Sequence, residues 1–215
     1  MLYLPPGADP ESVRTASVAE ARSKLGLGAE KQYIGYLGNI YQRDADLLFD
    51  TLAKLRSDDA HLLMVGDPGC QIPESLAARI TVTGRVPFDS MLDYLSACTV
   101  LALPLSDTIA NRGRWPSKIN EYVAVGRPTV ACDVGDVADL LREHEIGLLV
   151  APDAVDFASG IEQLLNDSAR AEKMGSTARE IALHQYSQDA IAVKLEDFYE
   201  TIIAAKGREN LELAC

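Results

Sequence analysis

The chain has 215 residues, of which 47% are hydrophobic and 24% are charged, and it carries a formal net charge of −12. These values are typical of a soluble globular protein with one large domain or two small ones. The excess of negative charge argues against general binding to nucleic acids or anionic membranes, because both require a basic surface.

The sequence also bears on the compartment in which the protein works. Its apolar runs are strand-sized and far shorter than a membrane span, and the first residues lack the basic start of a signal peptide. Cys70, Cys98, Cys132 and Cys215 show no C-x-x-C spacing, and three of them lie among apolar residues. We therefore expect reduced thiols in a cytoplasmic protein.

The first predicted element is a helix that begins at Asp9 or Pro10, runs to about Leu25 and is closed by Gly26 and Gly28. Beyond it, short apolar runs alternate with amphipathic stretches. The predicted strands are Gln32–Leu37, His61–Val65, Ile80–Thr83, Val100–Leu103, Thr129–Cys132 and Gly147–Val150. The predicted helices are Asp46–Leu55, Phe88–Ala97, Pro116–Val125, Asp136–His144 and Val155–Leu165.

Most of these strands are near-continuous apolar runs, as expected of strands covered on both faces. Alternating strands and helices predict an α/β fold: a doubly wound, Rossmann-like parallel sheet of about six strands with helices on both faces. Two further helices are predicted, from Ser168 to about His184 and from Ser187 to about Lys206. The second packs away from the sheet or crosses toward something else. The tail GRENLELAC is expected to fray.

In such a sheet, ligands bind beyond the carboxyl ends of the strands, where the strand order reverses. The loops at that edge are Gly38–Asp44, Gly66–Gln71, Gly84–Pro87, Pro104–Pro116 and Asp133–Asp136. All contain glycine, which permits close approach of the backbone to a ligand but is also common in such turns for steric reasons.

The segment NRGRWPSKINEYVAVGRPTVA, residues 111–131, concentrates positive charge in an otherwise acidic chain. Arg112, Arg114 and Lys118 precede its first acid, Glu121. Pro116 is well placed to open a helix. The start of a helix flanked by cations is an anion site, because its unpaired N–H groups and its dipole both favour negative charge. The segment predicts a phosphate site.

Six segments occur in a familiar order: YLPPGADPESV, YIGYLGNIYQRDADLL, LLMVGD, VTGRVPFDSMLDYLSACTVLALPLS, PSKINEYVAVGRPTVACDVGDVADLL and GLLVAP. Together they resemble the C-terminal, donor-binding domain of a GT-B fold glycosyltransferase of family four, the retaining group 1 enzymes. The resemblance runs from about Leu4 to about Tyr199. It indicates the family more strongly than the substrate.

The resemblance implies that residues 1–215 are a single nucleotide-sugar-binding domain and that the N-terminal acceptor domain is absent. The partners it implies are a nucleotide-diphosphate sugar and that missing domain, through which peripheral membrane contact would be made. It implies neither a cofactor nor a required metal. The chain alone is expected to be inactive.

Glu121 matches the second glutamate of the family's E-x7-E pattern, which accepts hydrogen bonds from the ribose hydroxyls of the nucleotide. Its place one turn after Ser117 and Lys118 is compatible with that role. The alternative is an exposed helix glutamate. The first glutamate of the pattern would fall at Gly113, and this departure puts contacts to the donor sugar in doubt.

The resemblance assigns the diphosphate to Lys118 and to the N–H groups after Pro116, so that Ser117 and Ile119 join the expected donor site. The family's first loop usually carries an arginine after the glycine and a lysine a few residues later. Here Gly38 is followed by Asn39, which could donate a hydrogen bond but no charge.

Two replacements for the missing charge are open. Arg43 either substitutes for the lysine, acting with Lys118 in catalysis, or is a plain surface arginine. Arg112 and Arg114 could compensate from the opposite loop. Arg85 and Val86 match the position whose backbone meets the nucleotide base.

Three functions fit the sequence. The first is the donor-binding half of a retaining glycosyltransferase, in which the leaving phosphate assists deprotonation of the acceptor and no carboxylate dyad is needed. The second is a non-catalytic nucleotide-sugar-binding subunit that needs an acceptor-domain partner. The third is a nucleotide-sugar 2-epimerase of the same fold, which would place histidines and acids in the loops, where they are scarce.

Overall fold

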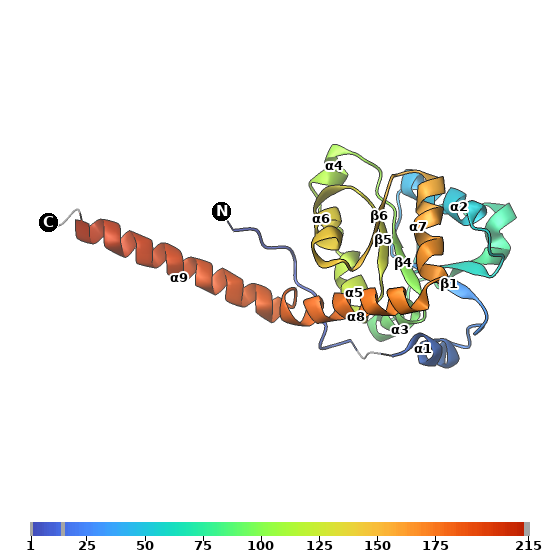
Figure 1. Ribbon diagram of the computed structural model, residues 1–215, viewed down its shortest axis with the longest axis horizontal. Helices are drawn as coiled ribbons and strands as arrows, with labels where there is room; N and C mark the ends of the chain where they lie inside the picture. The colour runs from blue at the N-terminus through green and yellow to red at the C-terminus, as the bar shows by residue number, and fades with distance from the viewer. Residues whose placement is uncertain (1, 14–15, 213–215) are drawn as a thin grey trace.

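The computed structural model describes residues 2–13 and 16–212, and it contains one parallel sheet of six strands (Figure 1). The strands are β1 Gln32–Leu37, β2 Ala60–Val65, β3 Ile80–Val82, β4 Val100–Leu103, β5 Thr129–Cys132 and β6 Gly147–Val150. Their order in the sheet is β3-β2-β1-β4-β5-β6, so the order reverses between β1 and β4. The predicted doubly wound α/β fold is confirmed.

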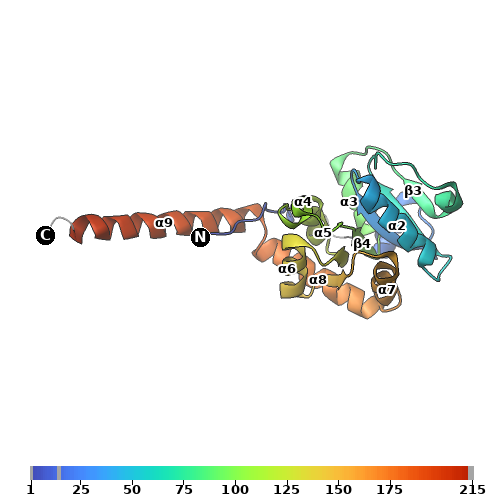
Figure 2. The ribbon, with the colours of Figure 1, turned by 90° about the horizontal axis from the view of Figure 1, so that it is seen from above.

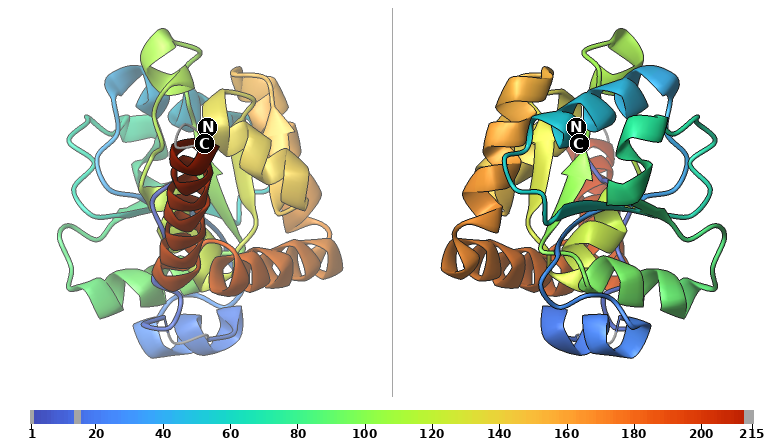
Figure 3. Two further views of the ribbon diagram at one scale, coloured as in Figure 1. Left: turned by 90° about the vertical axis from the view of Figure 1, so that its left-hand side faces the viewer. Right: turned by 90° about the vertical axis from the view of Figure 1, so that its right-hand side faces the viewer.

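Helices connect the strands and cover both faces of the sheet. They are α1 Val18–Leu25, α2 Gln42–Lys54, α3 Phe88–Ser96, α4 Ile109–Arg112, α5 Lys118–Val125, α6 Gly135–His144, α7 Ala154–Leu165, α8 Ser168–His184 and α9 Gln188–Glu212, with a 3-10 turn η1 at Glu74–Arg79. Helices α2 and α7 pack side by side on one face, and α3, α5 and α6 cover the other. Helix α8 crosses the amino ends of the strands (Figure 3).

The core forms where these layers meet, and the strand composition explains it. Strands β2, β4 and β5 are buried at every position, which requires the continuous apolar runs seen in the sequence. The largest fully buried side chains include Phe157 from α7 and Tyr122 from α5. Helices α5 and α7 therefore each present an apolar face to the sheet.

Strands β1 and β4 separate soon after they meet. They pair only at Ile34 with Val100 and at Gly35 with Leu101, whereas β1 continues to Leu37. By contrast, β1 and β2 pair over the full six residues of both strands. The gap beyond the short pairing opens the sheet at the point where its order reverses.

A tyrosine hydroxyl occupies this gap. The Leu37 N–H donates to the Tyr122 hydroxyl at 3.1 Å, and that hydroxyl donates to the Ala102 carbonyl at 3.2 Å. The hydroxyl thus satisfies one backbone group on β1 and one on β4, both of which have left the ladder. Because Tyr122 is fully buried, water cannot take its place without a change in packing.

The structure corrects the predicted N-terminal helix. Helix α1 begins at Val18 rather than at Asp9 or Pro10, because Ser17 and Glu20 form a capping box there. Upstream, Ala8 forms an isolated parallel bridge to Ser187. The predicted closure at Gly26 is confirmed, with φ at 66°. Arg14 and Thr15 lie outside the described residues.

Two further boundaries lie four or more residues from the sequence prediction. Helix α2 begins at Gln42 rather than Asp46, since the Asp44 and Ala45 N–H groups both donate to the Tyr41 carbonyl at 2.9 Å. Helix α9 continues to Glu212, past the end expected near Lys206, and Leu213–Cys215 lie outside the described residues.

Helix α9 extends away from the rest of the chain (Figures 1 and 2). It leaves apolar side chains in solvent: Val193 is 55% exposed and Ile203 70% exposed. Within residues 2–13 and 16–212, we find no helix with the length and apolar character required to cross a membrane.

We predict that Tyr122→Phe lowers the free energy of unfolding by about 1–3 kcal/mol, because it leaves the Leu37 N–H and the Ala102 carbonyl buried without a partner. Urea denaturation measures the change. Tyr94→Phe is the matched control, since the Tyr94 hydroxyl makes none of the hydrogen bonds found among the described residues. Equal stability of the two variants would contradict this role for Tyr122.

Candidate functional site

A pocket of about 540 Å³ lies at the carboxyl ends of β1 and β4, where the strand order reverses. One wall is the loop after β1 and the first turn of α2. The other is the loop between β4 and α5. The lining residues are Tyr36, Asn39, Ile40, Tyr41, Asp44, Pro68, Gly69, Leu103, Pro104, Leu105, Arg114, Trp115, Pro116, Ser117 and Lys118. The predicted basic segment therefore meets the first glycine loop here.

Lys118, the first residue of α5, brings its ammonium group to the β1 side of the pocket. Nζ donates a hydrogen bond to the Tyr36 hydroxyl, approaches the Asn39 carbonyl at 3.4 Å and lies 3.8 Å from the centre of the Tyr36 ring. Burial, and next the charge of Arg114, lower the pKa of Lys118 to about 7. The charges of Asp44 and Glu121 oppose this lowering.

Arg114 supplies the second cation of the pocket. Its guanidinium carbon lies 5.5 Å from the centre of the exposed Tyr41 ring. Its Nε is buried and has no hydrogen-bond partner among the described residues. An unpaired buried donor is costly, so a ligand that brought an acceptor to this N–H would stabilise the site.

Arg112, only two residues away, is not part of the pocket. Its Nε and Nη2 donate to the two carboxylate oxygens of Asp107 at 2.6 and 2.8 Å. This bidentate pair is exposed to solvent. Of the two arginines considered as compensating cations, the structure brings Arg114 to the site and engages Arg112 elsewhere.

Asp44 is the one carboxylate among the residues that line this pocket. Its side chain, 3% exposed, projects from the first turn of α2. Its Oδ1 accepts hydrogen bonds from both the backbone N–H and the hydroxyl of Ser106. The Ser106 carbonyl in turn accepts from Asn111 Nδ2 at 2.7 Å. This network links α2 firmly to the loop that follows β4.

The start of α5 offers fewer backbone donors than the sequence predicts. The Ile119 N–H donates to the Pro116 carbonyl at 3.0 Å, and the Asn120 N–H donates to the Ser117 carbonyl at 2.9 Å. Both amides are used within the first turn, which begins the helix at Lys118 rather than Pro116. The Ile119 side chain is fully buried in the core. The amides of Ser117 and Lys118 donate none of the hydrogen bonds found among the described residues, so they are available to a ligand.

Glu121 faces a second, smaller pocket of about 270 Å³. Phe88 and Leu92 from α3 and Asn120 from α5 share the lining with it. Burial raises the pKa of Glu121, and Lys118, one turn earlier on the same face, partly offsets the rise. The half-buried carboxylate is therefore available to accept hydrogen bonds in a sheltered hollow.

The remaining predicted site residues are placed less directly. Gly38 has φ at 78° and turns the chain out of β1, and Asn39 is exposed at the pocket, where its carbonyl contacts Lys118. Arg43 is exposed on α2 and is not among the residues that line either pocket. Arg85 is exposed and Val86 half-buried in the turn before α3.

Sequence reasoning did not single out Tyr36, Tyr41, Asp44 or Phe88 as site residues. Tyr36 lies inside an apolar strand, and nothing local marks its hydroxyl as pocket-facing. Asp44 could have been found had the start of α2 been placed at Gln42, because an acid in the first turn of a helix lies at the ligand edge.

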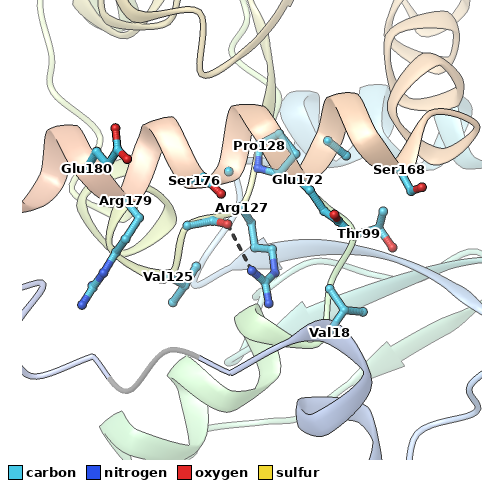
Figure 4. Close-up of a pocket in the computed structure, with 13 residues that line it drawn as sticks. Val18, Thr99, Val125, Arg127, Pro128, Ser168, Glu172, Ser176, Arg179 and Glu180 are labelled. Carbon is cyan, nitrogen blue, oxygen red and sulfur yellow. Dashed lines mark hydrogen bonds between the residues drawn. The ribbon is translucent and has the colours of Figure 1, made fainter.

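A larger cavity, of about 630 Å³, lies at the opposite, amino ends of the strands (Figure 4). Its two arginines are already engaged. Arg127 donates to the carbonyls of Ser96, Gly126 and Ala16, and Arg179 donates to those of Ala124 and Val13. These contacts hold the surrounding segments together, so the cavity lacks a vacant charged donor comparable with that of Arg114.

The arrangement at the carboxyl edge can hold an anion next to a polyhydroxyl group. Two cations and the amides of Ser117 and Lys118 lie at one pocket, and the Glu121 carboxylate lines a second, smaller one. No group of three or more His, Cys, Asp or Glu side chains is placed to bind a metal ion in the part of the chain that the structure describes.

Such a fold, with a pocket where its strand order reverses, defines a domain of the doubly wound α/β class. Residues 31–167, well over half of the chain, match the family of group 1 glycosyl transferases. The chain therefore belongs to the group 1 glycosyltransferases, as the six sequence segments predicted.

One relative is the GDP-mannose-dependent alpha-(1-6)-phosphatidylinositol monomannoside mannosyltransferase of Mycobacterium tuberculosis. The two proteins are 30% identical over 218 residues, which cover 95% of this chain and 57% of that enzyme. The chain thus spans little more than half the length of this relative.

Solved structures agree on the fold. Sucrose-phosphate synthase from Thermosynechococcus elongatus superposes with a TM-score of 0.73 and is 25% identical, covering 94% of this chain and 52% of that one. Anabaena HepE in complex with UDP gives a TM-score of 0.75 at 20% identity, over 94% and 57% of the two chains.

We predict that Lys118 makes stability depend on pH. Its pKa in the folded chain lies below the ordinary 10.5, so between about 7 and 10.5 the unfolded chain binds more protons, and the free energy of unfolding rises with pH. The gain is lost again as pH falls toward 7.

Relative to Lys118→Met, the wild type should gain up to about 1.4 kcal/mol per pH unit across this window. Urea denaturation at pH 7, 8 and 9 measures the difference, and Lys54→Met, at an exposed lysine of α2, is the control. Parallel pH profiles for the wild type and Lys118→Met would show that Lys118 keeps an ordinary pKa.

Proposed function

We propose that this chain is the donor-binding half of a retaining glycosyltransferase and binds a nucleotide-diphosphate sugar. The observation that carries the proposal is the buried, unpartnered Nε of Arg114 next to Lys118, in the pocket where the strand order reverses. Buried donors of this kind are normally paired, and a diphosphate oxygen would pair this one.

The rest of the donor follows from the two pockets. The diphosphate lies against Arg114, Lys118 and the Ser117 amide. The ribose lies in the smaller pocket, where Glu121 accepts hydrogen bonds from its hydroxyls. The base then reaches the turn of Arg85 and Val86, near Phe88, which shares that pocket with Glu121.

These groups also account for the chemistry that the chain would contribute. Breaking the bond between sugar and diphosphate leaves negative charge on the departing phosphate. Fixed cations aimed at that position stabilise the transition state more than the ground state. Lys118 is the catalytic cation of the proposal, with Arg114 in the place expected of Arg43, and no metal is required for this role.

The acceptor is proposed to bind outside this chain. The mannosyltransferase of Mycobacterium tuberculosis uses GDP-mannose and is nearly twice as long as the matched region. We propose that the corresponding missing half carries the acceptor site, so that the chain alone binds donor without transferring it. Calorimetry with UDP, GDP, ADP and dTDP, followed by the matching sugar nucleotides, tests binding, and product analysis tests transfer.

Arg114→Ala should weaken binding of the preferred nucleoside diphosphate by about 1.5–3 kcal/mol, the range for a hydrogen bond to a charged group. Arg112→Ala is a closely matched control, because it removes the same side chain two residues away, where Asp107 engages it at the surface. Equal effects of the two substitutions would mean that only the general positive charge of the loop matters.

Glu121→Ala should weaken the same binding by about 1–3 kcal/mol, because the ribose hydroxyls lose their acceptor. Isothermal titration calorimetry measures the loss, and inorganic pyrophosphate, which has no ribose, provides the internal comparison. Unchanged nucleotide affinity would remove Glu121 from the ribose role, and an equal loss for pyrophosphate would indicate a general effect on the site.

A further inference from the structure

The free side of the Asp44 carboxylate is not explained by binding of a diphosphate. Its Oδ1 accepts both donors of Ser106, whereas its Oδ2 makes none of the hydrogen bonds found in the described part of the chain. The side chain is fixed at the start of α2 and lines the same pocket as Arg114 and Lys118. An oriented acceptor therefore faces a cavity that is otherwise built for anions.

The Asp44 carboxylate interacts electrostatically with the cations of the pocket. Asp44 raises the pKa of Lys118 and Arg114 lowers it, so the three charged groups lie within interacting range. A phosphate placed against Oδ2 would meet a like charge in a sheltered site, which is costly. The phosphates must therefore lie against Arg114 and Lys118 and away from Oδ2, and a neutral part of the ligand must lie against Oδ2.

A nucleotide sugar has two neutral parts that carry hydroxyl donors, the ribose and the transferred sugar. The ribose is already assigned to Glu121 in the smaller pocket, which does not share its lining with Asp44. The hydroxyls left for the larger pocket belong to the transferred sugar. A carboxylate is a strong acceptor for such groups, because the hydrogen bond is charge-assisted.

We infer that Asp44 is a specificity-determining residue, which accepts a hydrogen bond from a hydroxyl of the donor sugar through Oδ2. This inference rests on the donor-binding function proposed above. Asp44 then serves the donor sugar at a site where position 113 carries a glycine, which has no side chain to contribute. Ser106 is a positioning residue, because it holds Oδ1 and so orients Oδ2.

A hydrogen bond to Asp44 should let the site discriminate between donor sugars. A buried acceptor left without its donor is penalised, so sugars that lack the recognised hydroxyl should be rejected. A nucleoside diphosphate without a sugar does not reach Oδ2. Its affinity should therefore be unchanged when Asp44 is substituted, or should rise because a like charge is removed.

The experiment compares Asp44→Asn with Asp46→Asn, an exposed acid of the same helix two residues further on. Calorimetry first identifies which of UDP, GDP, ADP and dTDP the wild-type chain binds. The affinities of that diphosphate and of its sugar nucleotides, UDP-glucose and GDP-mannose among them, are then measured for each variant. We expect Asp44→Asn to weaken the preferred sugar nucleotide at least tenfold and the diphosphate less than twofold, with Asp46→Asn neutral for both.

Equal changes for the diphosphate and the sugar nucleotide would overturn the inference and leave the donor site intact, as would an unchanged affinity for every sugar nucleotide. Failure of the wild type to bind any of the four diphosphates would refute the donor site and the inference together. Should Asp44→Asn not fold, Ser106→Ala removes one of the two donors that orient the carboxylate. It should show the same selectivity in weaker form, and a uniform loss would count against the inference.

Discussion

The site depends on the separation of β1 from β4, which Tyr122 maintains. Where the strand order reverses, the loops after the two neighbouring strands lead to opposite faces of the sheet, and the crevice between them is the usual ligand site. Here the Tyr122 hydroxyl accepts a hydrogen bond from the Leu37 N–H and donates one to the Ala102 carbonyl. Both strands can therefore separate without leaving either of these backbone groups unpaired. The loops that follow diverge, and the pocket lies between them. Because Tyr122 belongs to α5, the same helix that separates the strands also presents Lys118 to the opening.

The positive and negative groups of the pocket come from different segments of the chain. The cations come from the loop and helix after β4, and the buried acid comes from the helix after β1. The two sides are tied together through Ser106, so neither can move away to relieve attraction or repulsion. The chain has a net charge of −12, so most of its surface repels anions. The positive region at the pocket attracts them into the opening.

Much of the fold could be predicted from the sequence, because buried parallel strands need continuous apolar runs and those runs are visible. The predicted bounds of Gln32–Leu37, Val100–Leu103, Thr129–Cys132 and Gly147–Val150 agree with the structure. The N-terminal helix was misplaced because its true start, the capping box of Ser17 and Glu20, was overlooked in favour of Asp9 and Pro10. At the site, Arg112 and Arg114 are equivalent in sequence and differ only because Asp107 engages one of them. Arg43 and Asp44 are neighbours, and the phase of α2 alone decides which faces the pocket.

Trp115, the only tryptophan of the sequence, forms part of the pocket wall. Its Nε1 donates to Asn120 at 3.0 Å, and its ring stacks on Tyr186 at a centroid separation of 6.4 Å and an angle of 10°. Tyr186 directly precedes the segment that leads into α9, and Asn120 also donates to the Gly7 carbonyl. The indole is therefore a built-in optical probe: light emitted by the chain after ultraviolet excitation originates largely at one wall of one pocket. A change in its colour or intensity reports on that wall and on the two chain segments anchored behind it, without any label.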